Sequence, residues 1–200
     1  QVRSQVDRQQ VTERAARYGT DPVGWVRERL GQTVWSKQAA IMESVRDHRR
    51  TAVRSAHGIG KSWTAALVAC HWLDTHPPGE AFVVSTAQTF AQVRAILWRY
   101  IRKHHRAANL IGRVNQTEWH IDDEIVGYGR KPADHDESAF QGIHAPFVLV
   151  ILDEAIGVPK PLWESADSLI SNEDSRLLAV GNPTDPATEF HEVCKPGSGW

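Results

Sequence analysis

The sequence predicts an α/β fold in which a mostly parallel central sheet is flanked by helices, and three observations support this prediction. Short apolar runs typical of buried strands recur along the 200 residues, and stretches with helical spacing separate them. A glycine-containing loop joins the first of these strands to a helix, and two acidic residues follow a later strand that is wholly apolar. Strands that alternate with helices are typical of parallel sheets, because parallel neighbours need crossover connections.

Each element follows from a local pattern. Pro22 after Thr20 and Asp21 marks a helix start, and apolar runs bounded by turn residues mark the strands. Alternation of polar and apolar residues between 112 and 130 predicts a small β-hairpin or meander insertion. The expected helices cover residues 1–18, 20–30, 38–48, 63–75, 89–105 and 161–169. The expected strands cover residues 51–53, 81–86, 147–152 and 176–180.

Composition sets the class of protein. We expect residues 1–200 to form a single domain, with residues 1–48 as an N-terminal helical lead-in. No apolar run approaches the length of a transmembrane helix, so we expect no membrane partner. The two cysteines, Cys70 and Cys194, lack metal-ligand spacing. The net charge of -1 excludes a general attraction to nucleic acid. Any contact with DNA must therefore come from a local basic patch or from another domain.

The loop after the first strand has the chemistry of a phosphate cradle. Gly58 and Gly60 let backbone N–H groups turn toward phosphate oxygens, and the following helix adds its partial positive charge. Lys61 would reach the β and γ phosphates of ATP, and the Ser62 hydroxyl would bind Mg²⁺. The usual pattern has glycine where this chain has Ser55, so an ordinary strand-to-helix loop with a solvated lysine is the alternative. The predicted nucleotide-binding residues here are Ser55, Ala56, His57, Gly58, Ile59, Gly60, Lys61, Ser62 and Trp63.

The acidic pair after the apolar strand predicts the second half of the site. Residues 147–152 are apolar without interruption, which is typical of a central parallel strand buried on both faces. The carboxyl end of such a strand would bring Asp153 and Glu154 beside the phosphate loop. Asp153 is then placed to hold Mg²⁺, and Glu154 to orient or deprotonate the attacking water. The alternative is a buried strand that ends in a solvated acidic turn.

Three further residues have weaker signals. Asn182 ends the next apolar strand and is a candidate sensor of the γ-phosphate, although an Asn-Pro turn explains it equally. The Trp35 ring could stack on adenine, and the Gln38 amide could read the adenine edge. From the sequence alone, Trp35 as a core residue and Gln38 as a solvated helix position are equally good interpretations.

One basic stretch, residues 98–106, ends an expected helix. Cations at a helix C-terminus are favoured by the dipole and are commonly just solvated. The second interpretation, a DNA-contacting patch, stays open at this point.

Taken together, these blocks resemble the ATPase domain of the terminase large subunit of tailed bacteriophages and prophages. The resemblance extends from Asp21 to Val193, and the order of its blocks is more specific than any one of them. In that family the first glycine of the loop is commonly replaced, which accommodates Ser55. The blocks that carry the resemblance are residues 35–38, 53–62, 85–89, 93–94, 140–144, 152–155, 181–184 and 189–190.

The resemblance implies a P-loop NTPase of the RecA-like, additional-strand catalytic-glutamate (ASCE) type, acting as a homo-oligomeric ring. It implies Mg²⁺-dependent ATP hydrolysis that drives double-stranded DNA into a procapsid in the cytoplasm of an infected bacterium. The implied partners are the portal protein and the small terminase subunit. Relatives usually carry a C-terminal nuclease domain that residues 1–200 do not include, so we expect no nuclease activity from this chain.

The resemblance also implies catalytic roles for individual residues. Glu154 would be the catalytic base, Asn182 would couple the γ-phosphate to movement, and Arg54 would contact that phosphate within the same subunit. Lys61, Ser62 and Asp153 would keep the phosphate and Mg²⁺ roles given above. An arginine supplied by a neighbouring subunit stays unassigned, with Arg113 and Arg130 as candidates.

Two other functions fit parts of the pattern. A RecA-like helicase or translocase shares the loop and the acidic pair, but it normally needs a second motor domain with its own motifs. A nucleotide-binding switch without significant turnover would not need a catalytic carboxylate at Glu154.

Overall fold

The computed structural model describes residues 2–56, 58–131, 140 and 142–200, with side chains from Gln9 onward. Within these residues, seven strands form one sheet in the order β1-β7-β6-β2-β5-β4-β3. The pairs from β1 across to β5 are parallel, and β5, β4 and β3 are antiparallel. The strands are β1 (Arg50–Arg54), β2 (Ala81–Thr86), β3 (Arg113–Asn115), β4 (Glu118–Ile121), β5 (Glu124–Gly129), β6 (Phe147–Asp153) and β7 (Arg176–Gly181).

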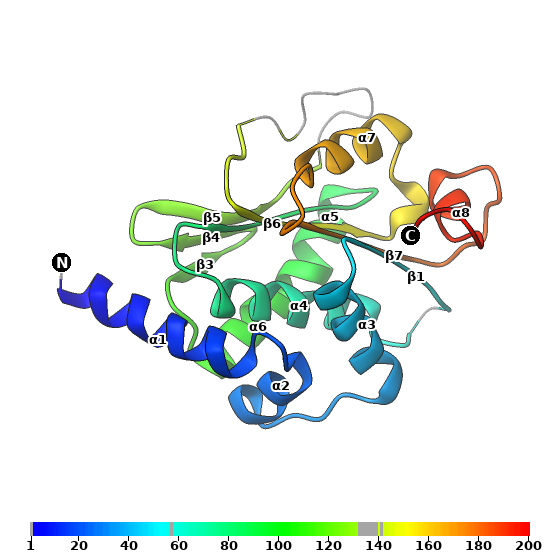
Figure 1. Ribbon diagram of the computed structural model, residues 1–200. Coiled ribbons are helices and arrows are strands. Elements are labelled where there is room, and N and C mark those ends of the chain that lie inside the picture. The colour runs from blue at the N-terminus through cyan, green and yellow to red at the C-terminus, as the bar shows by residue number, and fades with distance from the viewer. Residues whose placement is uncertain (1, 57, 132–139, 141) are drawn as a thin grey trace.

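Helices cover both faces of this sheet. In Figure 1, α7 lies on one face, and α3, α4 and α6 lie on the other with α1 and α2 outside them. The α-helices are α1 (Val2–Tyr18), α2 (Pro22–Leu30), α3 (Ser36–Asp47), α4 (Lys61–Thr75), α5 (Phe90–Gln92), α6 (Trp98–Ala108), α7 (Lys160–Leu169) and α8 (Glu189–Val193). A π-helical turn, η1 (Val93–Leu97), joins α5 to α6, and a 3-10 turn, η2 (Ala155–Gly157), follows β6.

The central strand β6 explains why the sequence gives three layers. Its Leu149 and Ile151 side chains belong to the core under α4 and α6, whereas Val148, Val150 and Leu152 belong to the core under α7. A strand with an apolar core on each face must be apolar at every position, as this one is. The predicted α/β fold is therefore confirmed. In addition, β7 lies between the phosphate-loop strand β1 and the acidic strand β6, as an additional-strand fold requires.

The meander expected at residues 112–130 is present as the antiparallel strands β3, β4 and β5, and β5 also pairs in parallel with β2, so the meander extends the main sheet. One sequence-based expectation needs correction. The helix expected at 89–105 is interrupted by η1 and continues to Ala108. The π turn brings Val93 and Trp98, five residues apart, onto the same side of the helix. Both side chains approach Gly129 so closely that a Cβ there would lie 2.5 Å from Val93 and 2.2 Å from Trp98.

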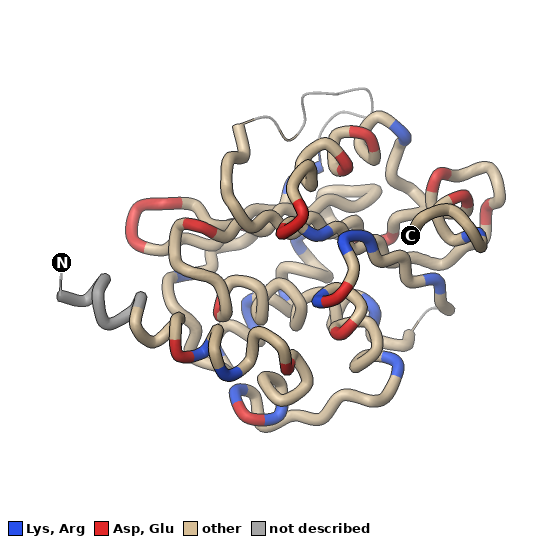
Figure 2. Tube along the Cα trace, in the orientation of Figure 1, with Lys and Arg blue, Asp and Glu red and all other residues tan. Residues whose placement is uncertain are grey.

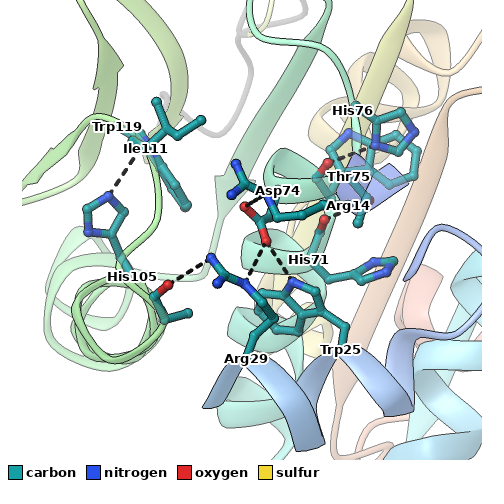
Figure 3. A network of polar contacts seen from close by, with 12 residues as sticks. Arg14, Trp25, Arg29, His71, Asp74, Thr75, His76, His105, Ile111 and Trp119 are labelled. Carbon is teal, nitrogen blue, oxygen red and sulfur yellow. Dashed lines mark hydrogen bonds and ion pairs between the residues drawn. The ribbon is translucent and has the colours of Figure 1, made fainter. Parts of the chain in front are cut away.

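A buried charge cluster fastens the first two helices to α4 (Figure 3). The Asp74 carboxylate, whose side chain is 1% exposed, lies 2.9 Å from Arg14 Nε of α1 and 3.4 Å from Arg29 Nε of α2. The Trp25 indole N–H also donates to it at 2.8 Å. Burial raises the pKa of Asp74, and these three partners oppose that rise. Because the carboxylate is desolvated, its partners are needed for it to remain charged.

We expect Asp74→Asn to lower the free energy of unfolding by about 3 to 5 kcal/mol. The amide keeps an acceptor for Trp25 but removes the negative charge that Arg14 and Arg29 face at this position. Urea denaturation followed by circular dichroism measures the effect. The exposed pair of Glu192 and Lys195 supplies the control, and Glu192→Gln should leave the midpoint near that of the wild type. An Asp74→Asn variant as stable as this control would show that the cluster is not stabilising.

His71 makes stability depend on pH. Burial lowers the pKa of His71 to about 4, and its Nε2–H donates to the carbonyl oxygen of Tyr18 at 2.9 Å. The unfolded chain takes up a proton on this histidine near pH 6.5 and the folded chain does so only near pH 4. The contribution of His71 is therefore fully present above pH 6.5, and about 3 kcal/mol of it is lost as the pH falls to 4.

The corresponding test compares variants. Asp74 and Asp153 have raised pKa values and act with the opposite sign, so the wild-type curve alone mixes several groups. We expect His71→Gln to be less stable than the wild type at pH 7 and to approach it at pH 4.5, in urea titrations at both values. A difference between the two proteins that does not change with pH would contradict the assignment.

Candidate nucleotide-binding site

The phosphate loop and the acidic strand end meet at the carboxyl edge of the sheet. The Ser62 hydroxyl at the start of α4 donates to Asp153 Oδ1 at the end of β6, over 2.9 Å. These two residues are 91 positions apart in the chain. The loop is also tied to the neighbouring strand, because the Ser55 N–H donates to the carbonyl oxygen of Gly181 in β7 at 3.1 Å. Strand order alone produces this convergence, since β7 is the only strand between β1 and β6 among the described residues.

Lys61 is held over the loop. Its side chain is buried, and its Nζ donates to the carbonyl oxygens of Ser55 at 3.2 Å and Ala56 at 2.8 Å. Gly58 and Gly60 have φ values of 80° and 84°, in the left-handed region that glycine tolerates without strain. The loop conformation thus depends on both glycines. His57, predicted to belong to the same cradle, lies outside the described residues.

Asp153 is almost completely enclosed. Burial raises its pKa to about 6, the Glu154 charge adds to the rise, and the hydrogen bond from Ser62 opposes it. The charge of Lys61 also favours the ionised carboxylate. Its second oxygen, Oδ2, has no hydrogen-bond partner among the described residues. A buried carboxylate oxygen with a free lone pair is suited to a ligand that brings its own positive charge.

Glu154 has a backbone conformation that is unusual for its residue type. Its φ of 49° and ψ of 51° lie in the left-handed region, where a residue with a Cβ is strained by about 1 to 2 kcal/mol. Its N–H donates to Asp153 Oδ1 at 3.1 Å, and the η2 turn closes with a bond from Gly157 N–H to the Glu154 carbonyl oxygen. The turn fits closely against the segment that follows β2, because a Cβ at Gly157 would lie 2.5 Å from the Gln88 side chain.

Two hydroxyls at this edge lack a partner among the described residues, those of Ser55, which was predicted to bind nucleotide, and of Thr86, which was assigned no role from the sequence. Ser55 Oγ and Thr86 Oγ1 are buried, and like Asp153 Oδ2 they have no hydrogen-bond partner in the described part of the chain. Thr86 ends β2 and is paired with Leu152, the residue before Asp153. A hydroxyl-bearing residue at the last position of an apolar strand is the sequence signal that would have found it. Unpaired buried polar atoms cost free energy, so this edge is prepared for a polar ligand.

The residues predicted to contact adenine, Trp35 and Gln38, lie at the start of α3. The Gln38 amide nitrogen lies 3.1 Å from where a Cβ on Gly60 would be, which places it against the phosphate loop. Trp35 is 49% exposed, so it is not the core residue of the alternative interpretation. The Trp63 ring instead faces His104 of α6, with ring centroids 5.3 Å apart. Trp63 is therefore placed to contribute its backbone, but not its ring, to the site.

The other predicted residues lie at adjacent strand ends. Arg54 ends β1, is exposed and is paired with Gly181 of β7. Asn182 follows Gly181 directly, and its carbonyl oxygen accepts from Thr184 N–H at 2.8 Å in a turn. Arg130, a candidate for the arginine supplied to a neighbouring subunit, follows β5 and lies 4.1 Å from the Tyr128 ring centroid. Gln141, which belongs to the 140–144 block that carries the resemblance, lies outside the described residues.

Comparisons with known proteins fit this geometry. The chain is 25% identical over 179 residues to a probable terminase large subunit of Enterobacteria phage P7. The match covers 82% of the chain and 35% of that relative. The chain is similar to a terminase large subunit. It spans only about a third of the relative's length, and no protein-family model matches it.

Solved structures agree in fold. The large terminase ATPase domain of Thermus phage P74-26 superposes with a TM-score of 0.61 at 22% identity, covering 80% of the chain and 69% of that domain. The HK97 bacteriophage large terminase gives a TM-score of 0.60 at 15% identity, covering 86% of the chain and 39% of that protein. The resemblance to large-terminase ATPase domains, expected from the motif blocks, is confirmed. Within the described residues, no helix is long and apolar enough to cross a membrane.

Proposed function

We propose that this chain is the ATPase domain of a DNA-packaging motor, in which Mg²⁺-dependent ATP hydrolysis drives double-stranded DNA into a procapsid. The observation that carries this proposal is the hydrogen bond between Ser62 and Asp153 at the carboxyl edge of a parallel sheet. It joins the two halves of a phosphate and metal site from distant parts of the chain. The sequence relative and the structural neighbours support the same function.

The residues at this edge suit a metal-bound triphosphate. The backbone N–H groups of the loop and the N-terminus of α4 would bind phosphate oxygens, and Lys61 would exchange its carbonyl partners for the β and γ phosphates. Ser62 and Asp153 would hold Mg²⁺, a cation that binds one or two protein oxygens and otherwise phosphates and water. Bound there, Mg²⁺ would neutralise charge on the phosphates. Trp35 and Gln38 would contact the adenine ring.

Glu154 would take the role of general base. The left-handed backbone of Glu154 ends the extended course of β6, so the chain turns directly after Asp153. From there the Glu154 carboxylate would accept a proton from a water aligned with the γ-phosphate. Arg54 and Asn182, at the ends of β1 and β7, would contact that phosphate and report its loss.

The wider assembly follows from the same proposal. We place the single domain of residues 1–200, with its helical lead-in at 1–48, in a ring of identical subunits in the host cytoplasm. The portal protein and the small terminase subunit would be its partners there. Among the described residues, no group of three or more His, Cys, Asp or Glu side chains is placed to hold a metal ion.

Steady-state phosphate release tests the catalytic part. We expect ATP hydrolysis that rises with Mg²⁺ concentration and stops with a chelator, and hydrolysis unaffected by the chelator would contradict the assigned metal. ATP binding without any turnover would favour the nucleotide-binding switch. ATP-dependent separation of duplex strands would favour a helicase. Protection of DNA from nuclease in a complete packaging reaction then tests translocation.

A further inference from the structure

Charge is distributed very unevenly along this chain. Between Glu80 and Glu118 there is no acidic residue, although the chain has 24 Asp and Glu in total. The same stretch carries six Lys and Arg and runs from β2 through η1 and α6 to β3. Acidic residues gather just beyond it, and Figure 2 shows them at the turn between β4 and β5, where Asp122, Asp123 and Glu124 lie. A chain with a net charge of -1 thus contains one strongly basic segment.

The cations of this segment share one side of α6. Arg99, Lys103 and Arg106 are spaced four and three residues apart and are exposed, so they follow one another along the helix over about 10 Å. The opposite side of α6 is buried against α4 and the sheet. Arg94 of η1 is exposed one turn earlier. We call these four cations the α6 basic face, which consists of Arg94, Arg99, Lys103 and Arg106.

Neighbouring acids do not neutralise this face. Within the described residues, none of its four cations has an ion-pair partner. Arg99 lies 5.0 Å from the Tyr100 ring centroid, a contact that leaves its charge in place. Arg102 lies beside the face and donates to the Gln116 carbonyl oxygen. Burial lowers the pKa of Arg102, and the positive charges of Arg106 and Arg94 lower it further. The cations therefore repel one another, which costs stability unless an anion binds.

The helix dipole does not explain this arrangement. It favours cations only in the last turn, where Arg106 lies. Arg94 and Arg99 lie before that last turn in the continuous helical segment that runs from α5 to the end of α6, where the dipole gives cations no stabilisation. A solvated C-terminal cluster is thus an incomplete explanation of the pattern.

We propose that the α6 basic face binds the phosphate backbone of duplex DNA. This inference rests on the proposed function, in which DNA is the substrate, and it assigns the contact to a surface separate from the nucleotide site. Cations about one helical turn apart, or roughly 5.4 Å, would each face several charges of a polymer that carries one negative charge per about 1.7 Å of axis. Because the proposed contact is to phosphates, which carry no sequence information, it would read charge and not sequence.

Salt-dependent DNA binding tests the proposal. The triple variant Arg99→Gln, Lys103→Gln and Arg106→Gln is compared with the wild type by fluorescence anisotropy on a labelled random duplex, without nucleotide. Each phosphate contact adds about 0.9 to the slope of log affinity against log salt concentration, so we expect the slope to fall by about 2 to 3 between 50 and 200 mM salt. Affinity at the lower salt should fall at least about tenfold.

Two matched variants complete the design. The control, Arg27→Gln with Lys160→Gln and Lys195→Gln, removes the same charge from exposed cations on α2, on α7 and just after α8, and it should keep the wild-type slope. Arg99→Lys with Arg106→Lys keeps the charge and should retain the slope. An unchanged slope in the first triple variant, or an equal loss in the control, would overturn the proposal. Because no nucleotide is present, this result does not depend on whether the wild type hydrolyses ATP.

Discussion

The Glu154→Gln variant should bind ATP as the wild type does and hydrolyse it about 100-fold to 10,000-fold more slowly. The amide keeps the size of the carboxylate but cannot accept a proton from water. The phosphate contacts come from the loop and from Lys61, and the bond between Ser62 and Asp153 does not involve the Glu154 side chain. Calorimetry with ATP and steady-state phosphate release measure the two effects separately.

A second substitution at the same position separates catalysis from backbone strain. Glu154 has a left-handed backbone that glycine adopts freely, so Glu154→Gly should be as inactive as the glutamine variant and not less stable. A loss of activity caused by misfolding would instead appear as a lower unfolding midpoint. Turnover in Glu154→Gln equal to that of the wild type would remove Glu154 from the role of base.

The Lys61→Ala variant should lose about 10-fold to 160-fold in affinity for ATP and have correspondingly little turnover. A charge-assisted hydrogen bond to phosphate contributes about 1.5 to 3 kcal/mol, and this ammonium is buried at the mouth of the loop. Because Lys61 is proposed to contact the β and γ phosphates, its loss should weaken ATP and ADP much more than AMP. Calorimetric titration with the three nucleotides measures the pattern.

The controls for this variant follow from the contacts of Lys61 in the fold. Its Nζ also bonds the carbonyl oxygens of Ser55 and Ala56, so the substitution loosens the loop as well. Lys61→Met keeps the apolar stem and should show the same loss. Lys160→Ala removes an exposed lysine on α7 and should bind ATP normally. Equal ATP affinity in Lys61→Ala and the wild type would contradict the phosphate-loop assignment.

The sequence was sufficient to predict how the two halves of the site meet. Apolar runs and a glycine-containing loop determine which strands are central and parallel, and the carboxyl ends of such strands lie at one edge. The sequence alone therefore predicts that Asp153 and Ser62 are neighbours. Short motifs predict this much because backbone topology, not side-chain detail, brings them together.

Features that depend on tertiary packing could not be predicted. The π turn in η1 arises because Val93 and Trp98 both pack beside Gly129, a contact between elements with no local sequence pattern. The left-handed backbone of Glu154 is equally invisible, since glutamate has no preference for it. The buried cluster around Asp74 joins three helices, and only the fold shows that an aspartate in α4 faces α1 and α2.

The most direct test of the central claim is a crystal structure of this chain with Mg²⁺ and a non-hydrolysable ATP analogue. We predict a triphosphate in the loop, with Lys61 Nζ on its terminal phosphates and the metal about 2.0 to 2.1 Å from Ser62 Oγ. Asp153 should bind the metal directly or through one water, with the Glu154 carboxylate facing the γ-phosphate. A triphosphate bound elsewhere, with Lys61 still on the Ser55 and Ala56 carbonyls and no metal near Asp153, would contradict the claim.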